Sequence, residues 1–201
     1  MHIRTYLLIL SFLWSLFACT VESPEPVSST LISNAVIFDG SGNDPYEGSV
    51  RFDATTQRIV AVGDLEAIPG EVVIDAKGQA LAPGFIDTHS HHYEDADKFR
   101  HMPGVLSQGI TTIVRGMDGS AGNYQSVAKF NIAFEASPAA INVASFSAHN
   151  TIRQLIMGDD NRRHATPSEI EAMAALIAAD MQAGALGLST GLEYEPGIFS
   201  T

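Results

Sequence analysis

The second part of the chain alternates short apolar runs with connections long enough to hold helices. The runs GFIDTH, GITTIVRG, INVASFSA and GALGLSTG occur in this order between residues 84 and 191. The connection before the last run carries a helix signal, because Thr166 can cap it, Pro167 suits its first position and Glu169 completes a T-x-x-E capping box. Gly184 then suits its end. Strands that alternate with helices predict a parallel α/β sheet or barrel.

Residues 31–82 have a different, purely β texture. LISNAVIFDG reads as a strand closed by a turn, GSVRFDATTQRIVAVGD as a hairpin, and EVVIDAKGQALAPG as a second hairpin with Lys77-Gly78 at the bend. These short antiparallel strands are too few to close a sandwich. Residues 31–82 are therefore predicted to form part of a small β-sandwich domain.

The amino terminus reads as an export signal. Residues 1–18 combine the positive Arg4 with the apolar run LLILSFLWSLFA, which is too short for a comfortable spanning helix. The sequence LFAC resembles a bacterial lipoprotein box, which predicts cleavage before Cys19 and lipidation of its thiol. An ordinary signal peptide with an incidental cysteine is the alternative. Thr20 follows the cysteine rather than Asp, which by analogy suggests the periplasmic face of the outer membrane, and residues 19–30 read as a Pro/Ser-rich tether.

Composition narrows the possible partners. The chain has 201 residues and a formal net charge of −12, from 11 basic and 23 acidic side chains, without a basic cluster. A nucleic-acid partner is therefore not expected. With one cysteine, an intramolecular disulfide cannot form.

Three histidines stand close together in IDTHSHH, residues 86–92. Residues two apart on a strand share a face, so His89 and His91 point the same way, together with Asp87. Two imidazoles at the carboxyl end of a barrel strand can bind one divalent ion, at the end where barrel active sites lie. Asp87 could ligate the ion or orient a histidine. The alternative is a chance H-x-H pair on a polar loop.

The motifs resemble those of a known family. LAPGFIDTHSHH resembles the first barrel strand of the amidohydrolase superfamily, whose metal-binding signature is H-x-H. SQGITTIVRGMDG, SAHNTIRQLIMG and ATPSEIEAMAALIAADMQAGALGLSTGLEYEPGIFST resemble consecutive blocks of the D-aminoacylases, the N-acyl-D-amino-acid deacylases. LISNAVIFDGSGNDPYEGSV resembles that family's amino-terminal β segment. The resemblance implies that residues 83–201 form the first half of a metal-dependent-hydrolase TIM-like (β/α)8 barrel, preceded by part of a β-sandwich.

The resemblance also implies a metal site with one or two Zn²⁺ ions. His89 and His91 would be ligands from the first strand. Many family members place a metal-binding cysteine within GNCG after the second strand, whereas this chain has GMDG, so Asp118 stands in that place. A carboxylate can ligate or bridge zinc but is a harder ligand; the alternative is a solvated turn residue beside Gly119. Glu193, after the fourth strand, is a second candidate bridge.

Substrate-binding residues are implied at His149, Arg153 and Tyr194, which match family blocks. Arg153 could hold a substrate carboxylate bidentately and Tyr194 could donate to it; a surface loop residue is the alternative for Arg153 and a satisfied loop histidine for His149. The implied activity is metal-dependent hydrolysis of a C–N amide bond, in particular deacylation of N-acyl-D-amino acids, for which zinc activates water and polarises the carbonyl. The family's catalytic aspartate and further histidine ligands lie on later strands, beyond Thr201. Since a complete barrel needs roughly 250 residues, we expect the chain to be part of a longer enzyme and inactive alone.

Two other classes of function remain open at this point. GLSTG fits the nucleophile elbow G-x-S-x-G, which would make Ser189 a serine-hydrolase nucleophile. That motif requires a helix immediately after the serine, whereas LEYEPG follows here. The chain could also be a non-catalytic lipoprotein binding module, or an amidohydrolase acting on cyclic amides or isoaspartyl peptides. Bound metal distinguishes the binding module from the enzymes.

Overall fold

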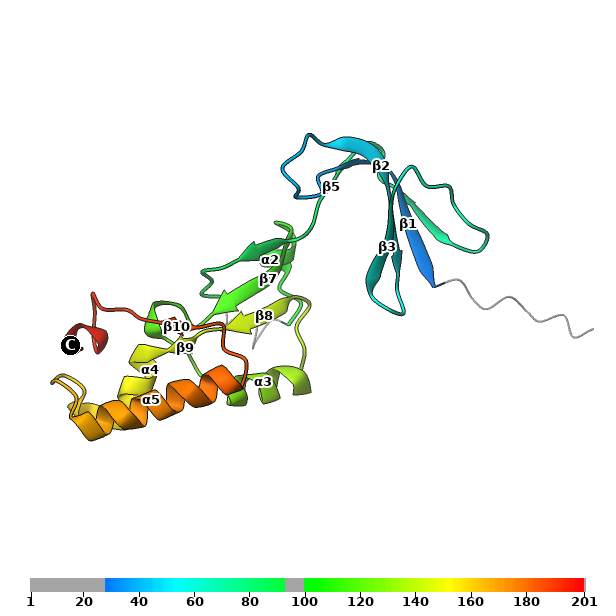
Figure 1. The fold of residues 1–201 in the computed structure, drawn as a ribbon. Helices are drawn as coiled ribbons and strands as arrows, with labels where there is room; N and C mark the ends of the chain where they lie inside the picture. The colour runs from blue at the N-terminus through cyan, green and yellow to red at the C-terminus, as the bar shows by residue number, and fades with distance from the viewer. Residues whose placement is uncertain (1–27, 93–99, 201) are drawn as a thin grey trace, which may run out of the picture. The chain divides into compact units, whose positions relative to one another are not determined.

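The computed structural model describes residues 28–92 and 100–200 and divides the chain into two units, Met1–Ala82 and Pro83–Thr201 (Figure 1). The predicted signal peptide, Cys19 and the tether up to residue 27 lie outside the described residues. In the parts of the chain that are described, no helix is both long and apolar enough to cross a membrane.

The first unit contains one sheet built around a central strand, β1 (Ser29–Ile37). β2 (Tyr46–Asp53) pairs antiparallel with β1, and β3 (Arg58–Gly63) pairs antiparallel with β2, as the first predicted hairpin requires. β1 begins inside the predicted tether, because Ser29 pairs with Asp53 and extends the ladder. The buried hydrophobic residues of this unit are Leu31, Ala35, Ile37 and Val50, and the last three form one cluster.

The second predicted hairpin is wrong. β4 (Val72–Asp75) and β5 (Ala80–Leu81) both run parallel to β1 and pair with successive parts of it. Lys77 and Gly78 have φ angles of 53° and 75°. They form a local irregularity between β4 and β5 and do not reverse the direction of the chain. This irregularity lies opposite a second one in β1 at Asn34. The Asn34 carbonyl oxygen accepts a hydrogen bond from the Gly78 amide at 2.7 Å.

A buried ion pair joins the strands of this unit. The Arg51 guanidinium donates to both carboxylate oxygens of Glu71, at 2.6 and 3.0 Å, and the Ser29 hydroxyl donates to the same carboxylate at 2.8 Å. The Glu71 side chain is fully shielded from solvent. The hydrogen bond from Arg51, with those from Ser29 and the Ile68 amide, lowers the pKa of Glu71 to about 2, against the opposing effect of desolvation.

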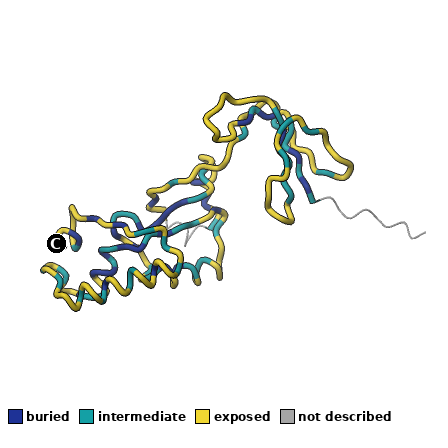
Figure 2. The backbone as a smooth tube through the Cα atoms, viewed as in Figure 1, coloured by how far each residue is buried: buried dark blue, intermediate teal, exposed yellow. Residues whose placement is uncertain are grey.

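The second unit has parallel strands in the predicted order. β6 (Phe85–Asp87), β7 (Ile110–Arg115) and β8 (Asn142–Ser145) form one sheet in the order β6-β7-β8. β9 (Ser147–Ala148) follows β8 after one residue and pairs in parallel with β10 (Leu188–Ser189). The four apolar runs are therefore confirmed as successive parallel strands. Buried residues gather along β7 and β9, as Figure 2 shows.

Helices fill the connections of this unit: α2 (Pro103–Leu106), α3 (Val127–Ala136), α4 (His149–Met157) and α5 (Pro167–Gln182). α5 begins with the predicted capping box between Thr166 and Glu169. α5 packs on α4 through Met173, whereas Ile170 is 52% exposed.

One buried carboxylate connects α5 to the sheet and to α3. Asp180 is 5% exposed. Its Oδ1 accepts a hydrogen bond from the Val127 amide at 2.9 Å, and its Oδ2 accepts one from the Ser147 hydroxyl at 2.8 Å. Val127 is the first residue of α3, so Asp180 satisfies a helix-end amide that has no partner within the helix. The contact therefore fixes three elements to one another.

Candidate metal centre

The two candidate histidines lie just after β6 rather than within it. β6 ends at Asp87, whose Oδ1 accepts a hydrogen bond from the His89 backbone amide at 3.1 Å. Ser90 is buried, and its amide donates to the Val114 carbonyl of β7 at 3.1 Å. Because Ser90 anchors the loop inward, the residues on either side of it, His89 and His91, both project outward. Asp87 thus orients His89 through the backbone, not through its ring.

Asp118 lies in a tight turn directly after β7. The 3₁₀ turn Met117–Gly119 follows Gly116, and Asp118 has φ 55° and ψ 26°, in the left-handed region. Aspartate tolerates this region better than most residues with a side chain. Gly116 has φ 82° and lets the backbone of the turn lie close to Phe146. A Cβ at this position would lie 2.6 Å from the Phe146 carbonyl oxygen.

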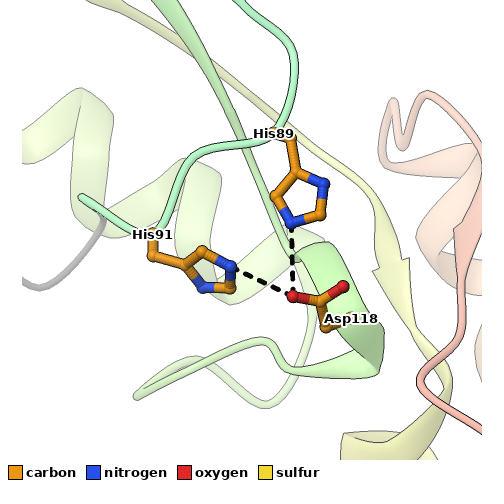
Figure 3. Close-up of side chains that lie close together, drawn as sticks. All are labelled: His89, His91 and Asp118. Atoms are coloured by element: carbon orange, nitrogen blue, oxygen red, sulfur yellow. Dashed lines mark hydrogen bonds and ion pairs between the residues drawn. The ribbon is translucent and has the colours of Figure 1, made fainter. Parts of the chain in front are cut away.

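The turn brings the Asp118 carboxylate to both histidines (Figure 3). Asp118 Oδ2 lies 3.2 Å from Nε2 of His89 and 3.1 Å from Nε2 of His91. The candidate ligand atoms of the three residues all lie within 4.8 Å of one another. Ligands around a tetrahedral zinc, each about 2.0 Å from the ion, are separated by roughly 3.3 Å. The two nitrogen–oxygen distances match this separation, so the two imidazoles and the carboxylate are a donor set that suits zinc.

The three side chains are open to solvent on one side in the described part of the chain. The exposed fractions are 54% for His89, 57% for His91 and 41% for Asp118. A structural zinc site is closed by four protein ligands, whereas a catalytic site keeps a position for water or substrate. Among the described residues, three candidate ligands leave one side of the group open to a further ligand, water or substrate.

Glu193 does not belong to this group. It is exposed in the loop that follows β10 and is not among the residues that gather their ligand atoms here. Its neighbour Tyr194 reaches the Asp118 turn instead, and its hydroxyl donates to the Asp118 carbonyl oxygen at 2.8 Å. The structure therefore does not support the prediction that Glu193 bridges a metal.

The predicted substrate-binding residues fall into two cases. Tyr194 lies beside the metal group and is 46% exposed; desolvation, followed by the negative charges of Asp118 and Glu193, raises its pKa. Arg153 is only 2% exposed. Its Nε donates to the Asn161 carbonyl at 3.2 Å, and its Nη2 donates to the carbonyls of Arg163 and Phe199.

These contacts correct the role predicted for Arg153. A guanidinium whose donors hold backbone carbonyls of the loops after α4 and β10 fixes those loops and is not presented to a substrate carboxylate. His149 begins α4, is half-buried, and has its Nε2 3.5 Å from the Ser200 hydroxyl. Burial, and then the nearby positive charge of Arg153, lower the pKa of His149.

Sequence reasoning missed how the Asp118 turn is held. Ser189 is 8% exposed and its hydroxyl is bonded to the turn, which excludes it as an exposed nucleophile. The next helical segment after it is the 3₁₀ turn Gly197–Phe199, so the strand–serine–helix arrangement of an elbow is absent between residues 188 and 200. Asn150, also buried, donates to the Gly191 carbonyl at 3.1 Å. The GLSTG motif had singled out Ser189, but for another role.

Comparisons with known proteins agree with this geometry. The sequence profile of the amidohydrolase family matches residues 72–200. The N-acyl-D-aspartate deacylase of Alcaligenes xylosoxydans xylosoxydans is 36% identical over 200 residues, which cover 88% of this chain and 39% of that enzyme. The chain thus spans about two fifths of the length of the curated relatives that it matches.

Solved structures give the same result. A structure of D-aminoacylase, an enzyme with a binuclear metal centre, is 32% identical, with a TM-score of 0.79 over 86% of this chain and 40% of that one. The N-acyl-D-glutamate deacylase of Bordetella bronchiseptica, solved with zinc and a phosphonate inhibitor, is 32% identical, with a TM-score of 0.77 over the same shares. The predicted resemblance and fold class are confirmed: the second unit has the first strands and helices of a D-aminoacylase-type barrel.

Proposed function

The chain belongs to the amidohydrolase family, and on that premise we propose that it supplies the metal-binding first strands of a Zn²⁺-dependent deacylase of N-acyl-D-amino acids. The observation that carries the proposal is the convergence of His89, His91 and Asp118 from the ends of two neighbouring barrel strands. The carboxyl ends of barrel strands are where catalytic groups collect.

The three side chains would share the work of holding one or two ions. His89 and His91 would each offer a ring nitrogen to the metal, and Asp118 would offer a carboxylate oxygen. A zinc ion held there supplies an activated water and polarises the amide carbonyl. The three side chains together carry one formal negative charge, from Asp118. A divalent ion bound by them would keep a net positive charge, which favours polarisation of the amide carbonyl. The Tyr194 hydroxyl donates to the backbone carbonyl oxygen of Asp118, so Tyr194 contacts the turn that carries the carboxylate.

The substrate class is proposed from the relatives. N-acyl-D-aspartate deacylase, D-aminoacylase and N-acyl-D-glutamate deacylase each align with 83–90% of this chain. A small N-acyl-D-amino acid is therefore the proposed substrate. Because Arg153 is buried, we assign no positively charged side chain of the described residues to the carboxylate of the substrate.

A chimeric enzyme tests the activity. The chain would replace the matching amino-terminal two fifths of the D-aminoacylase of Alcaligenes xylosoxydans xylosoxydans. The chimera should release D-amino acids from their N-acetyl derivatives, lose that activity to a chelator and regain it with Zn²⁺. The L enantiomers serve as the substrate control, and His89→Ala as the enzyme control. A folded, zinc-loaded chimera without activity toward any D substrate would contradict the substrate class.

The 201-residue chain itself should bind zinc without turnover. It presents three candidate ligands, and by family resemblance the proton-donating aspartate belongs to a later strand. Turnover of an N-acetyl-D-amino acid by the purified chain would contradict this expectation. Absence of zinc binding would favour the alternative of a non-catalytic binding module.

We further propose that the mature protein is anchored by a lipid on Cys19 at the periplasmic face of the outer membrane. The support is the LFAC sequence after an apolar segment, with the chain's one cysteine at that position. Intact-mass measurement of the membrane fraction should find an acylated amino-terminal cysteine, and Cys19→Ala should remove the acyl mass. A mature protein cut elsewhere and recovered without lipid would contradict the anchor.

A further inference from the structure

The turn that carries Asp118 is held at both ends by one buried hydroxyl. The Gly119 amide donates to Ser189 Oγ at 3.1 Å, and the same hydroxyl donates to the carbonyl oxygen of Gly116. Gly116 and Gly119 flank the two residues Met117 and Asp118. Ser189 lies in β10, 70 residues further along the chain than Gly119.

A second contact fixes the middle of the turn. The Tyr194 hydroxyl donates to the Asp118 carbonyl oxygen at 2.8 Å, and Asn150 Nδ2 makes a longer approach to the same oxygen at 3.5 Å. The loop that carries Tyr194 packs closely, since a Cβ on Gly191 would lie 2.3 Å from the Asp118 carbonyl oxygen. The backbone of Asp118 is thus fixed from the β10 side.

This fixation matters because Asp118 has an unfavourable backbone conformation. A left-handed φ of 55° persists in a residue with a side chain only where surrounding contacts determine it. In that conformation the carboxylate points at His89 and His91 (Figure 3). If the turn relaxed, its backbone would rotate and carry Oδ2 away from the two Nε2 atoms.

We infer that Ser189 and Tyr194 are positioning residues for the metal-binding carboxylate of Asp118. They touch its backbone rather than the metal. This inference rests on the proposed metal centre. It gives Ser189, the serine of GLSTG, a positioning role in place of the nucleophilic one that the motif suggested.

The test compares Ser189→Ala with Ser147→Ala in the purified, tag-free 201-residue chain. Ser147 is a matched control: its side chain is also buried, it lies on the paired strand β9, and its hydroxyl donates to Asp180 instead of the turn. Zinc affinity is measured by competition with a chromophoric chelator, and folding by thermal unfolding. Ser189→Ala should weaken Zn²⁺ binding by about 10- to 100-fold, whereas Ser147→Ala should stay within about twofold of the parent chain.

Both serine variants should lose thermal stability, so only the metal affinity separates positioning from general support. Equal zinc affinities in the two folded variants would overturn the inference. If Ser189→Ala does not fold, Tyr194→Phe decides, because this half-exposed side chain loses only its hydroxyl. Tyr194→Phe should weaken Zn²⁺ binding about tenfold, and an unchanged affinity would overturn the inference.

A metal-free readout separates this inference from the metal centre itself. If the parent chain binds no Zn²⁺, the proposed centre fails, but the imidazole ¹H–¹⁵N signals of His89 and His91 still report the position of the Asp118 carboxylate. Ser189→Ala should shift both sets of signals and Ser147→Ala should shift neither. Unshifted signals in Ser189→Ala would overturn the positioning role.

Discussion

Removing the buried carboxylate of Asp180 should strongly destabilise the second unit. Asp180→Ala leaves the Val127 amide and the Ser147 hydroxyl without their acceptors, at 2.9 and 2.8 Å in the parent structure. Each buried donor left unpaired costs about 1–3 kcal/mol. Relief from burying the carboxylate offsets part of this, so we expect a loss of about 2–4 kcal/mol, a large share of the roughly 5–15 kcal/mol that stabilises a typical domain.

Urea unfolding followed by the helical circular dichroism signal measures this loss, because the described α-helices lie between residues 103 and 182, all in the second unit. Asp180→Asn keeps one acceptor oxygen and should lose about half as much. Glu171→Ala removes an exposed carboxylate from the same helix and should change stability by less than about 0.5 kcal/mol. A loss below about 1 kcal/mol in Asp180→Ala would show that these two donors do not depend on the carboxylate.

Three further predictions concern the ion pair of the first unit and the Asp118 turn. Glu71 has its pKa lowered to about 2 in the folded chain, so its contribution to stability should be present above about pH 4.5 and be lost as the pH falls toward 2. Amide exchange in β1 should show that Glu71→Gln flattens this pH dependence; an unchanged dependence would contradict it. Gly116→Ala should cost about 2–4 kcal/mol by urea unfolding, from left-handed strain and overlap with Phe146. Gly184 has φ 96° and open space where a Cβ would lie, so Gly184→Ala should show the strain alone, and equal losses would reject the overlap. Asp118→Cys should keep zinc and gain a thiolate–Cd²⁺ charge-transfer band, since a thiolate is the softer ligand; Cd²⁺ binding without that band would show that residue 118 does not ligate.

Local signals in the sequence predicted much of the fold. The capping box of Thr166 and Glu169 depends on residues three apart, and the structure has it as expected. The parallel strands of the second unit follow from its four apolar runs, the third of which splits into β8 and β9. The parallel pairing of β4 with β1 could not be predicted from local signals. The pair Lys77-Gly78 suits a hairpin bend and also an irregularity that leaves the chain direction unchanged.

The candidate site also combines residues that a local sequence pattern predicts with residues whose position depends on distant parts of the chain. His89 and His91 are two residues apart, and their common side follows from that spacing and the burial of Ser90. The left-handed turn at Asp118 depends on a serine 70 residues away from Gly119, which no local pattern reveals. Arg153 matched a family block, but only the fold shows that backbone carbonyls occupy its donors.

The proposed metal centre consists of His89, His91 and Asp118. X-ray absorption at the zinc edge, on the purified 201-residue chain with one equivalent of Zn²⁺, tests it most directly. We predict two imidazole ligands and oxygen ligands at about 2.0–2.1 Å, with one imidazole lost in His89→Ala and one in His91→Ala. A zinc spectrum without imidazole scattering, or one that both substitutions leave unchanged, would contradict the claim.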